Sequence, residues 1–100
     1  MSADTPAHAA LSDIDRRLEA AILELLARRA PTSSICPSDA ARAVGDDDWR
    51  TLMDASRAAA GRLVARGTVE VTQGGEPADV ATARGPVRIR RTRPDADEPA

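Results

Sequence analysis

The spacing of apolar residues near the start of the chain predicts an amphipathic helix. Apolar side chains recur every three or four residues from Ile14 to Leu26. Ser12 is a favourable N-cap residue, and the acidic first turn after it suits the positive end of the helix dipole. A basic last turn suits the negative end, and Pro31 then interrupts the pattern. We therefore expect a helix over about residues 13–29.

Two further helices are predicted in the middle of the chain. Pro37 fits the first position of a short helix, where its missing N–H leaves no donor unpaired, and Gly45 fits the position after the helix ends. Asp47 or Asp48 is expected to cap a longer helix that ends at Gly67. One face of this third helix is expected to be buried, and it carries Trp49, Leu52, Met53, Ser56, Ala60, Leu63 and Val64.

The period then changes from helical to alternating, which predicts strands. Val69 and Val71 alternate with polar residues, and Val87 and Ile89 alternate with arginines. A Gly-Gly-Glu-Pro stretch between the two strands indicates a turn or loop. Glu70 is expected to lie opposite one of the arginines, as a favourable cross-strand pair.

The order of these elements predicts the fold class. With a very short strand at Ser34 and Ile35, the chain contains a helix, a strand, two more helices and a two-stranded hairpin. This is the order of a winged helix, an α+β fold with a three-helix helix-turn-helix core and a β-hairpin wing. We expect one such domain over residues 12–92. Residues 1–11 and the acidic residues 93–100 have the composition of disordered tails.

Four segments resemble a known protein family. They are Ile35-Cys36-Pro37-Ser38-Asp39-Ala40-Ala41-Arg42, Trp49-Arg50-Thr51-Leu52-Met53, Val69-Glu70-Val71-Thr72-Gln73 and Ala83-Arg84-Gly85-Pro86-Val87-Arg88. Together they are similar to the bacterial family called domain of unknown function 3253, over about residues 14–91. The resemblance implies a small winged-helix-like protein. It brings no established activity and no catalytic residues.

Composition and charge exclude several classes of protein. All 14 basic residues are arginine, and the net charge is −2, so the chain as a whole does not attract nucleic acid. No apolar run approaches the roughly 18 residues of a membrane helix, and the N-terminus lacks the pattern of a signal peptide. A single cysteine excludes an internal disulfide. We expect a cytoplasmic protein with no membrane partner.

Candidate catalytic and metal-binding groups are few. Cys36 precedes a helix, which can activate a thiol, but no base neighbours it, so we expect it to pack as a small apolar residue. His8 lies in the expected N-terminal tail, without the fixed geometry that catalysis needs. Asp46, Asp47 and Asp48 lack the spacing of a calcium loop and are expected to cap a helix. We therefore predict a non-enzymatic protein without cofactor or metal.

The arginines are the most informative candidate residues. Guanidinium groups bind phosphate well, and double-stranded DNA is a common partner of the expected fold. The predicted nucleic-acid-binding residues are Arg50, Thr51, Arg57 and Arg62 on the third helix and Arg84, Arg88 and Arg90 in or beside the wing. The alternative is that these arginines pair within the chain with Glu70, Asp54, Glu76 and Asp79.

The outer side of the third helix favours a different function. Ala55, Ala58, Gly61 and Ala65 make it smooth, whereas a helix that reads bases needs long polar side chains. Small residues allow another protein surface to approach closely. The alternative hypothesis is therefore a protein-interaction or homodimerisation module that does not bind DNA.

Overall fold

The computed structural model describes residues 11–30 and 32–92. In chain order the elements are α2 (Asp13–Ala27), β1 (Ser34–Ile35), α3 (Pro37–Gly45), the 3-10 helix η1 (Asp46–Leu52), α4 (Met53–Ala65), β2 (Val69–Gln73), β3 (Glu76–Pro77) and β4 (Arg88–Arg91). His8 and the two expected tails, apart from Leu11, lie outside the described residues.

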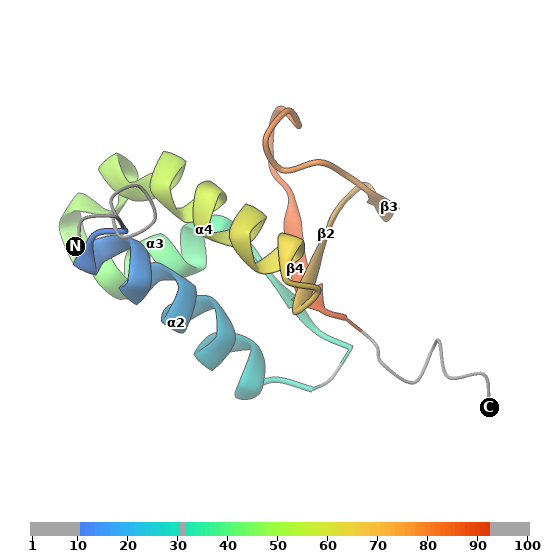
Figure 1. The fold of residues 1–100 in the computed structure, drawn as a ribbon, viewed down its shortest axis with the longest axis horizontal. Coiled ribbons are helices and arrows are strands. Elements are labelled where there is room, and N and C mark those ends of the chain that lie inside the picture. Colours follow the sequence, from blue (N-terminus) through green and yellow to red (C-terminus); the bar gives the residue numbers. More distant parts are fainter. Residues whose placement is uncertain (1–10, 31, 93–100) are drawn as a thin grey trace, which may run out of the picture.

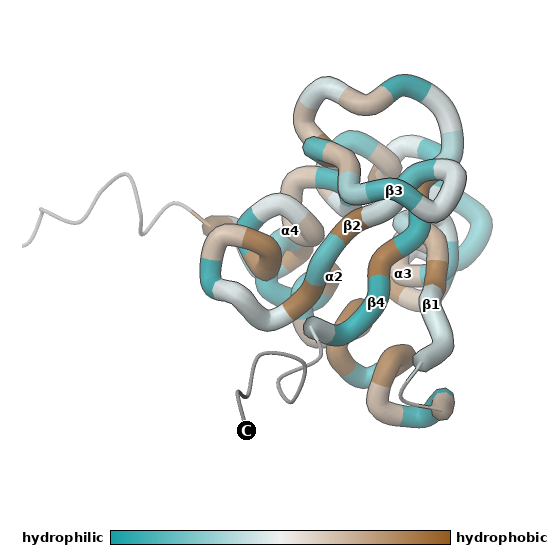
Figure 2. The backbone as a smooth tube through the Cα atoms, turned by 90° about the vertical axis from the view of Figure 1, so that its right-hand side faces the viewer, coloured by the Kyte–Doolittle hydropathy of each residue, from teal (hydrophilic) through white to brown (hydrophobic). Residues whose placement is uncertain are grey.

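The chain folds as an α+β domain with a four-stranded antiparallel sheet in the order β1-β4-β2-β3. The helices lie on one side of the sheet (Figure 1), and Figure 2 shows the sheet in front of them. Ile35, Ile89 and Val71 stand in one row across the sheet and join the hydrophobic core. None of the helices in the described part of the chain is long and apolar enough to cross a membrane.

The predicted start of the first helix is confirmed. Ser12 Oγ accepts a hydrogen bond from the Asp15 N–H, and the Ser12 N–H donates to Asp15 Oδ2, both at 3.1 Å. This reciprocal pair satisfies two backbone donors that would otherwise be unpaired. The helix ends at Ala27 rather than at residue 29, because the Arg28 N–H already turns towards the Leu25 carbonyl in a tighter last turn. Its buried residues are Leu18, Ile22 and Leu26.

The predicted continuous third helix is wrong. A 3-10 helix occupies Asp46–Leu52, where the long helix was expected to begin, and α4 starts only at Met53. Gly45 keeps a right-handed backbone, and Asp46 takes a φ of 50° with a ψ of −119°, a conformation that residues with a side chain rarely adopt. A Cβ at residue 45 would lie 2.7 Å from Leu52 Cδ1. A side chain at residue 45 would therefore have to displace the end of the Leu52 side chain, and the positive φ falls on the next residue.

The buried face of α4 consists largely of small side chains. Its buried residues are Ser56, Ala59, Ala60 and Leu63. Val64, which was expected in the core, is 40% exposed. The buried Ser56 hydroxyl donates a 2.7 Å hydrogen bond to the Pro37 carbonyl. This bond ties α4 to the start of α3, 19 residues earlier in the chain.

The predicted two-stranded wing is part of a larger sheet. The short strand at Ser34–Ile35 and the pairing of β2 with β4 are confirmed. However, β2 also forms a tight hairpin with β3 through Gly74 and Gly75, whose φ values of 61° and 85° are those that glycine adopts without strain. Residues 78–87 then connect β3 to β4, which lies between β1 and β2.

Candidate functional site

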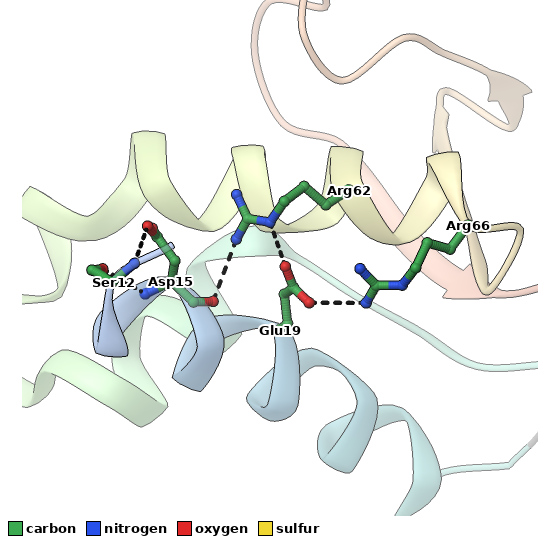
Figure 3. Close-up of polar contacts among 5 residues, drawn as sticks. All are labelled: Ser12, Asp15, Glu19, Arg62 and Arg66. Carbon is green, nitrogen blue, oxygen red and sulfur yellow. Dashed lines mark hydrogen bonds and ion pairs between the residues drawn. The ribbon is translucent and has the colours of Figure 1, made fainter. Parts of the chain in front are cut away.

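Arg62, a predicted phosphate-binding residue on α4, is bonded to groups on α2. Its Nε donates to Glu19 Oε2 on α2, and its Nη2 lies 3.4 Å from the Asp15 carbonyl (Figure 3). Arg66 donates to the other oxygen of Glu19 at 2.9 Å. The Glu19 side chain is only 13% exposed. One carboxylate therefore joins α2 to two arginines at the end of α4.

The carboxylates of this network have lowered pKa values. Burial acts to raise the pKa of Glu19, but the hydrogen bonds and charges of Arg62 and Arg66 outweigh it, so the pKa lies below 4.5. The pKa of Asp15 is also lowered, chiefly by the hydrogen bond from the backbone of Ser12. Both groups are therefore ionised at neutral pH.

Arg57 fastens the long connection between β3 and β4 to α4. Its guanidinium donates to three backbone carbonyls, those of Ala83 at 2.6 Å, Gly85 at 3.3 Å and Val80 at 3.4 Å. Carbonyl oxygens satisfy the N–H groups but do not neutralise the charge. Arg57 therefore has a structural role, and no carboxylate among residues 11–30 and 32–92 forms an ion pair with it.

Arg50 and Thr51 lie on η1 rather than on the same helix as Arg57. The Arg50 guanidinium lies over the Trp49 ring at 4.6 Å from its centroid, and the guanidinium of Arg42 lies at 4.3 Å. Such cation–π contacts are worth about 0.5–1 kcal/mol at exposed sites. The Thr51 hydroxyl donates to the Asp48 carbonyl at 2.8 Å. These two residues thus serve the local structure of the 3-10 segment.

Arg88 and Arg90 lie on the sheet face that points away from the helices. They alternate with the buried Ile89 and therefore share this face. Arg90 Nε donates to Glu70 Oε2 at 3.2 Å, so the predicted cross-strand pair is confirmed. Arg88 Nε donates to Ser34 Oγ at 2.8 Å, and its Nη2 donates to the Ser34 carbonyl at 3.0 Å.

A third arginine, Arg29, completes this group. Its Nη1 lies 3.5 Å from the same Ser34 carbonyl that Arg88 contacts. Ser34 itself stands opposite Arg90 in the sheet. We call Arg29, Ser34, Glu70, Arg88 and Arg90 the basic sheet surface. Three guanidinium groups and one carboxylate give it a charge of +2, in a chain whose net charge is −2.

The predicted site residues therefore do not form one group in the structure. Arg88 and Arg90 come together, whereas Arg57 and Arg62 are tied down on α4 and Arg84 lies exposed in the 78–87 connection. Arg29 was missed, although it stands in a basic pair shortly before the first strand, which is a signal that the sequence contains.

The structure also places two other candidates from the sequence, Cys36 and the three consecutive aspartates. Cys36 is the N-cap residue of α3, and its sulfur lies 2.9 Å from Arg88 Nη1. The three aspartates Asp46, Asp47 and Asp48 are exposed on η1. No group of three or more acidic, cysteine or histidine side chains suited to a metal occurs among the residues that the structure describes.

The fold and the site together describe a small α+β domain. It has a basic sheet surface, and the arginines of its helix α4 are bonded within the chain. The family model described as "Protein of unknown function (DUF3253)" matches residues 15–92, so the chain belongs to that family, as its sequence resemblance indicated. No curated protein matches the chain.

Proposed function

We propose that this chain is a non-enzymatic, winged-helix-type protein that binds the phosphate backbone of nucleic acid through the basic sheet surface. The observation that carries the proposal is the convergence of Arg29, Arg88 and Arg90 around Ser34, with Glu70 paired to Arg90. Guanidinium groups suit phosphate oxygens. The order α3, η1, α4, β2 and β4 supports the winged-helix class.

The surroundings of α4 favour backbone binding over base reading. Arg62 is paired with Glu19, Arg57 is bonded to carbonyls, and the exposed face of α4 otherwise carries Asp54 and small residues. Base recognition in the major groove needs long polar side chains. The proposed binding is therefore electrostatic, with little sequence preference, and double-stranded DNA is the expected partner.

A titration of random-sequence duplex DNA, followed by fluorescence anisotropy at 50 and 200 mM salt, tests the proposal. Three phosphate contacts give a slope of log K against log salt of about −2.7, which is a loss of roughly 40-fold across this range. Arg88→Gln and Arg90→Gln should each weaken binding and reduce the slope by about 0.9.

The matched control is Arg17→Gln, which removes the same charge from an exposed position on α2. Circular dichroism shows whether each variant keeps its fold. If Arg17→Gln weakens binding as much as Arg88→Gln does, only general charge attraction is at work. Absence of binding at 50 mM salt, where phosphate contacts are strongest, refutes the proposal.

A groove along α4 favours a second candidate, a homodimerisation module. The groove lies between α4 and the 78–87 connection, and Ala58, Gly61 and Ala65 line it together with Val80 and Ala81. Small residues permit close approach of a second copy. Light scattering on the wild type and on Ala58→Glu tests this: a dimer that the substitution dissociates supports it, and a wild-type monomer at high micromolar concentration contradicts it.

A further inference from the structure

A separate cleft lies where the start of α3, the Trp49–Met53 segment and the end of the 78–87 connection meet. It has a volume of about 400 Å³, which is within the range of small-molecule sites. Apolar groups form most of its lining, namely Pro37, Trp49, Met53, Pro86 and Val87. Its lining also includes the polar residue Ser38 and the charged residue Arg57.

Arg57 gives this cleft an unpaired positive charge. Three of the five N–H groups of a guanidinium account for its carbonyl bonds, which leaves two donors. No carboxylate lies within 4.0 Å of the Arg57 nitrogens in the described ranges 11–30 and 32–92. A half-buried cation without a counter-ion is an unusual neighbour for an apolar wall.

Other cations surround the same cleft. Arg42 and Arg50 lie over the Trp49 ring, and Arg88 contacts the sulfur of Cys36, which also lines the cleft. The nearby carboxylate of Asp39 accepts a 2.9 Å hydrogen bond from the Cys36 N–H at the helix start. Carboxylates of η1 also lie close to Trp49 in the chain, so the charge that bears on the cleft directly is that of Arg57, the charged residue in its lining.

We infer that this cleft binds a small organic anion, a carboxylate on an apolar body. The apolar part covers Met53, Pro86 and Val87, and the carboxylate receives one of the remaining N–H groups of Arg57. This inference does not depend on nucleic-acid binding, because it uses a different set of contacts. A charge-assisted hydrogen bond of this kind makes the acid bind roughly 10–100-fold more tightly than a neutral analogue.

Trp49 is the one tryptophan of the chain and lines the cleft, so its fluorescence reports on occupancy. The probes are 3-phenylpropanoate, octanoate and the uncharged 3-phenylpropanamide, titrated into the full chain. We expect a saturable change of Trp49 emission with at least one carboxylate and a response at least about tenfold weaker with the amide. Methyl shifts in the NMR spectrum should locate the acid at Met53 and Val87.

Substitutions then distinguish the loss of the Arg57 charge from a change in the shape of the cleft. Arg57→Gln should weaken the acid about tenfold and leave the amide unchanged, whereas Arg28→Gln, an exposed arginine on the far end of α2, should change neither. Because Arg57 also holds the 78–87 connection, Met53→Glu provides a second test: it places a carboxylate in the cleft and should abolish binding of the acid. The inference fails if acid and amide bind equally, or if neither carboxylate binds below roughly 10 mM.

Discussion

Replacing Glu19 with glutamine should destabilise the protein far more than the same change at Glu24. Glu19 is 13% exposed and bonds both Arg62, which is 27% exposed, and Arg66. Glu24 is 64% exposed and pairs only with Arg28, four residues later on the same helix. The two substitutions are chemically identical and lie on one helix, so the difference between them isolates the α2–α4 contact.

The expected size follows from burial. Exposed pairs contribute about 0–1 kcal/mol, and breaking a fully buried pair costs about 3–5 kcal/mol. The pair of Glu19 and Arg62 lies between these limits, and glutamine keeps one hydrogen-bond acceptor, so we expect a loss of about 1–2 kcal/mol. In a domain of this size that lowers Tm by about 5–15 °C. Glu24→Gln should cost less than about 0.5 kcal/mol.

Thermal and urea unfolding of both variants, followed by circular dichroism, provide the measurement. The urea slope should stay at its wild-type value, because the surface exposed on unfolding does not change. Equal losses in the two variants would show that the network adds no more than a surface pair. A loss at Glu19 below about 0.5 kcal/mol would refute the reasoning from burial.

Three further predictions concern pH and packing. The pKa of Glu19 is lowered in the folded state from its ordinary 4.5, so its contribution to the free energy of unfolding is present above pH 4.5. This contribution is lost as the pH falls through the lower folded pKa. In unfolding experiments in acid, the difference in stability between the wild type and Glu19→Gln should therefore disappear. Gly45→Ala should destabilise by about 1–3 kcal/mol in urea unfolding, since the new Cβ would lie 2.7 Å from Leu52 Cδ1; a neutral result would show that Leu52 moves aside freely. Ser56→Ala should cost about 1 kcal/mol, because it removes the buried hydrogen bond that joins α4 to the Pro37 carbonyl, and faster amide exchange at the start of α3 would report the loss.

Local signals in the sequence predicted the elements with strong caps and regular periods. The Ser12 cap, the start of α3 at Pro37 and the pairing of Glu70 with Arg90 all depend on neighbouring residues or on strand alternation, so short-range reasoning finds them. The break at Asp46–Leu52 instead goes with the positive φ of Asp46 and with Leu52 lying over Gly45, both of which are features of the folded chain. Helical periodicity does not contain that information.

The candidate site was only partly accessible to sequence reasoning, because pairing partners lie far apart along the chain. Glu19 and Arg62 are 43 residues apart, and Arg57 contacts carbonyls that carry no side-chain signal at all. Alternation did place Arg88 and Arg90 on one face. Arg29 joins them only because the antiparallel pairing of β1 with β4 brings Ser34 alongside.

The arrangement of the sheet bears on how the protein avoids self-association through its backbone. The two outer strands, β1 and β3, are each two residues long, and β3 contains Pro77, which has no N–H to offer another strand. The longer valine- and isoleucine-bearing strands β2 and β4 lie in the interior of the sheet and pair with each other, and the outer strands cover part of their other edges. An incoming chain therefore finds only short lengths of free backbone to pair with, and the segments of the sheet with the strongest tendency to form amyloid-like stacks are partly shielded by the fold.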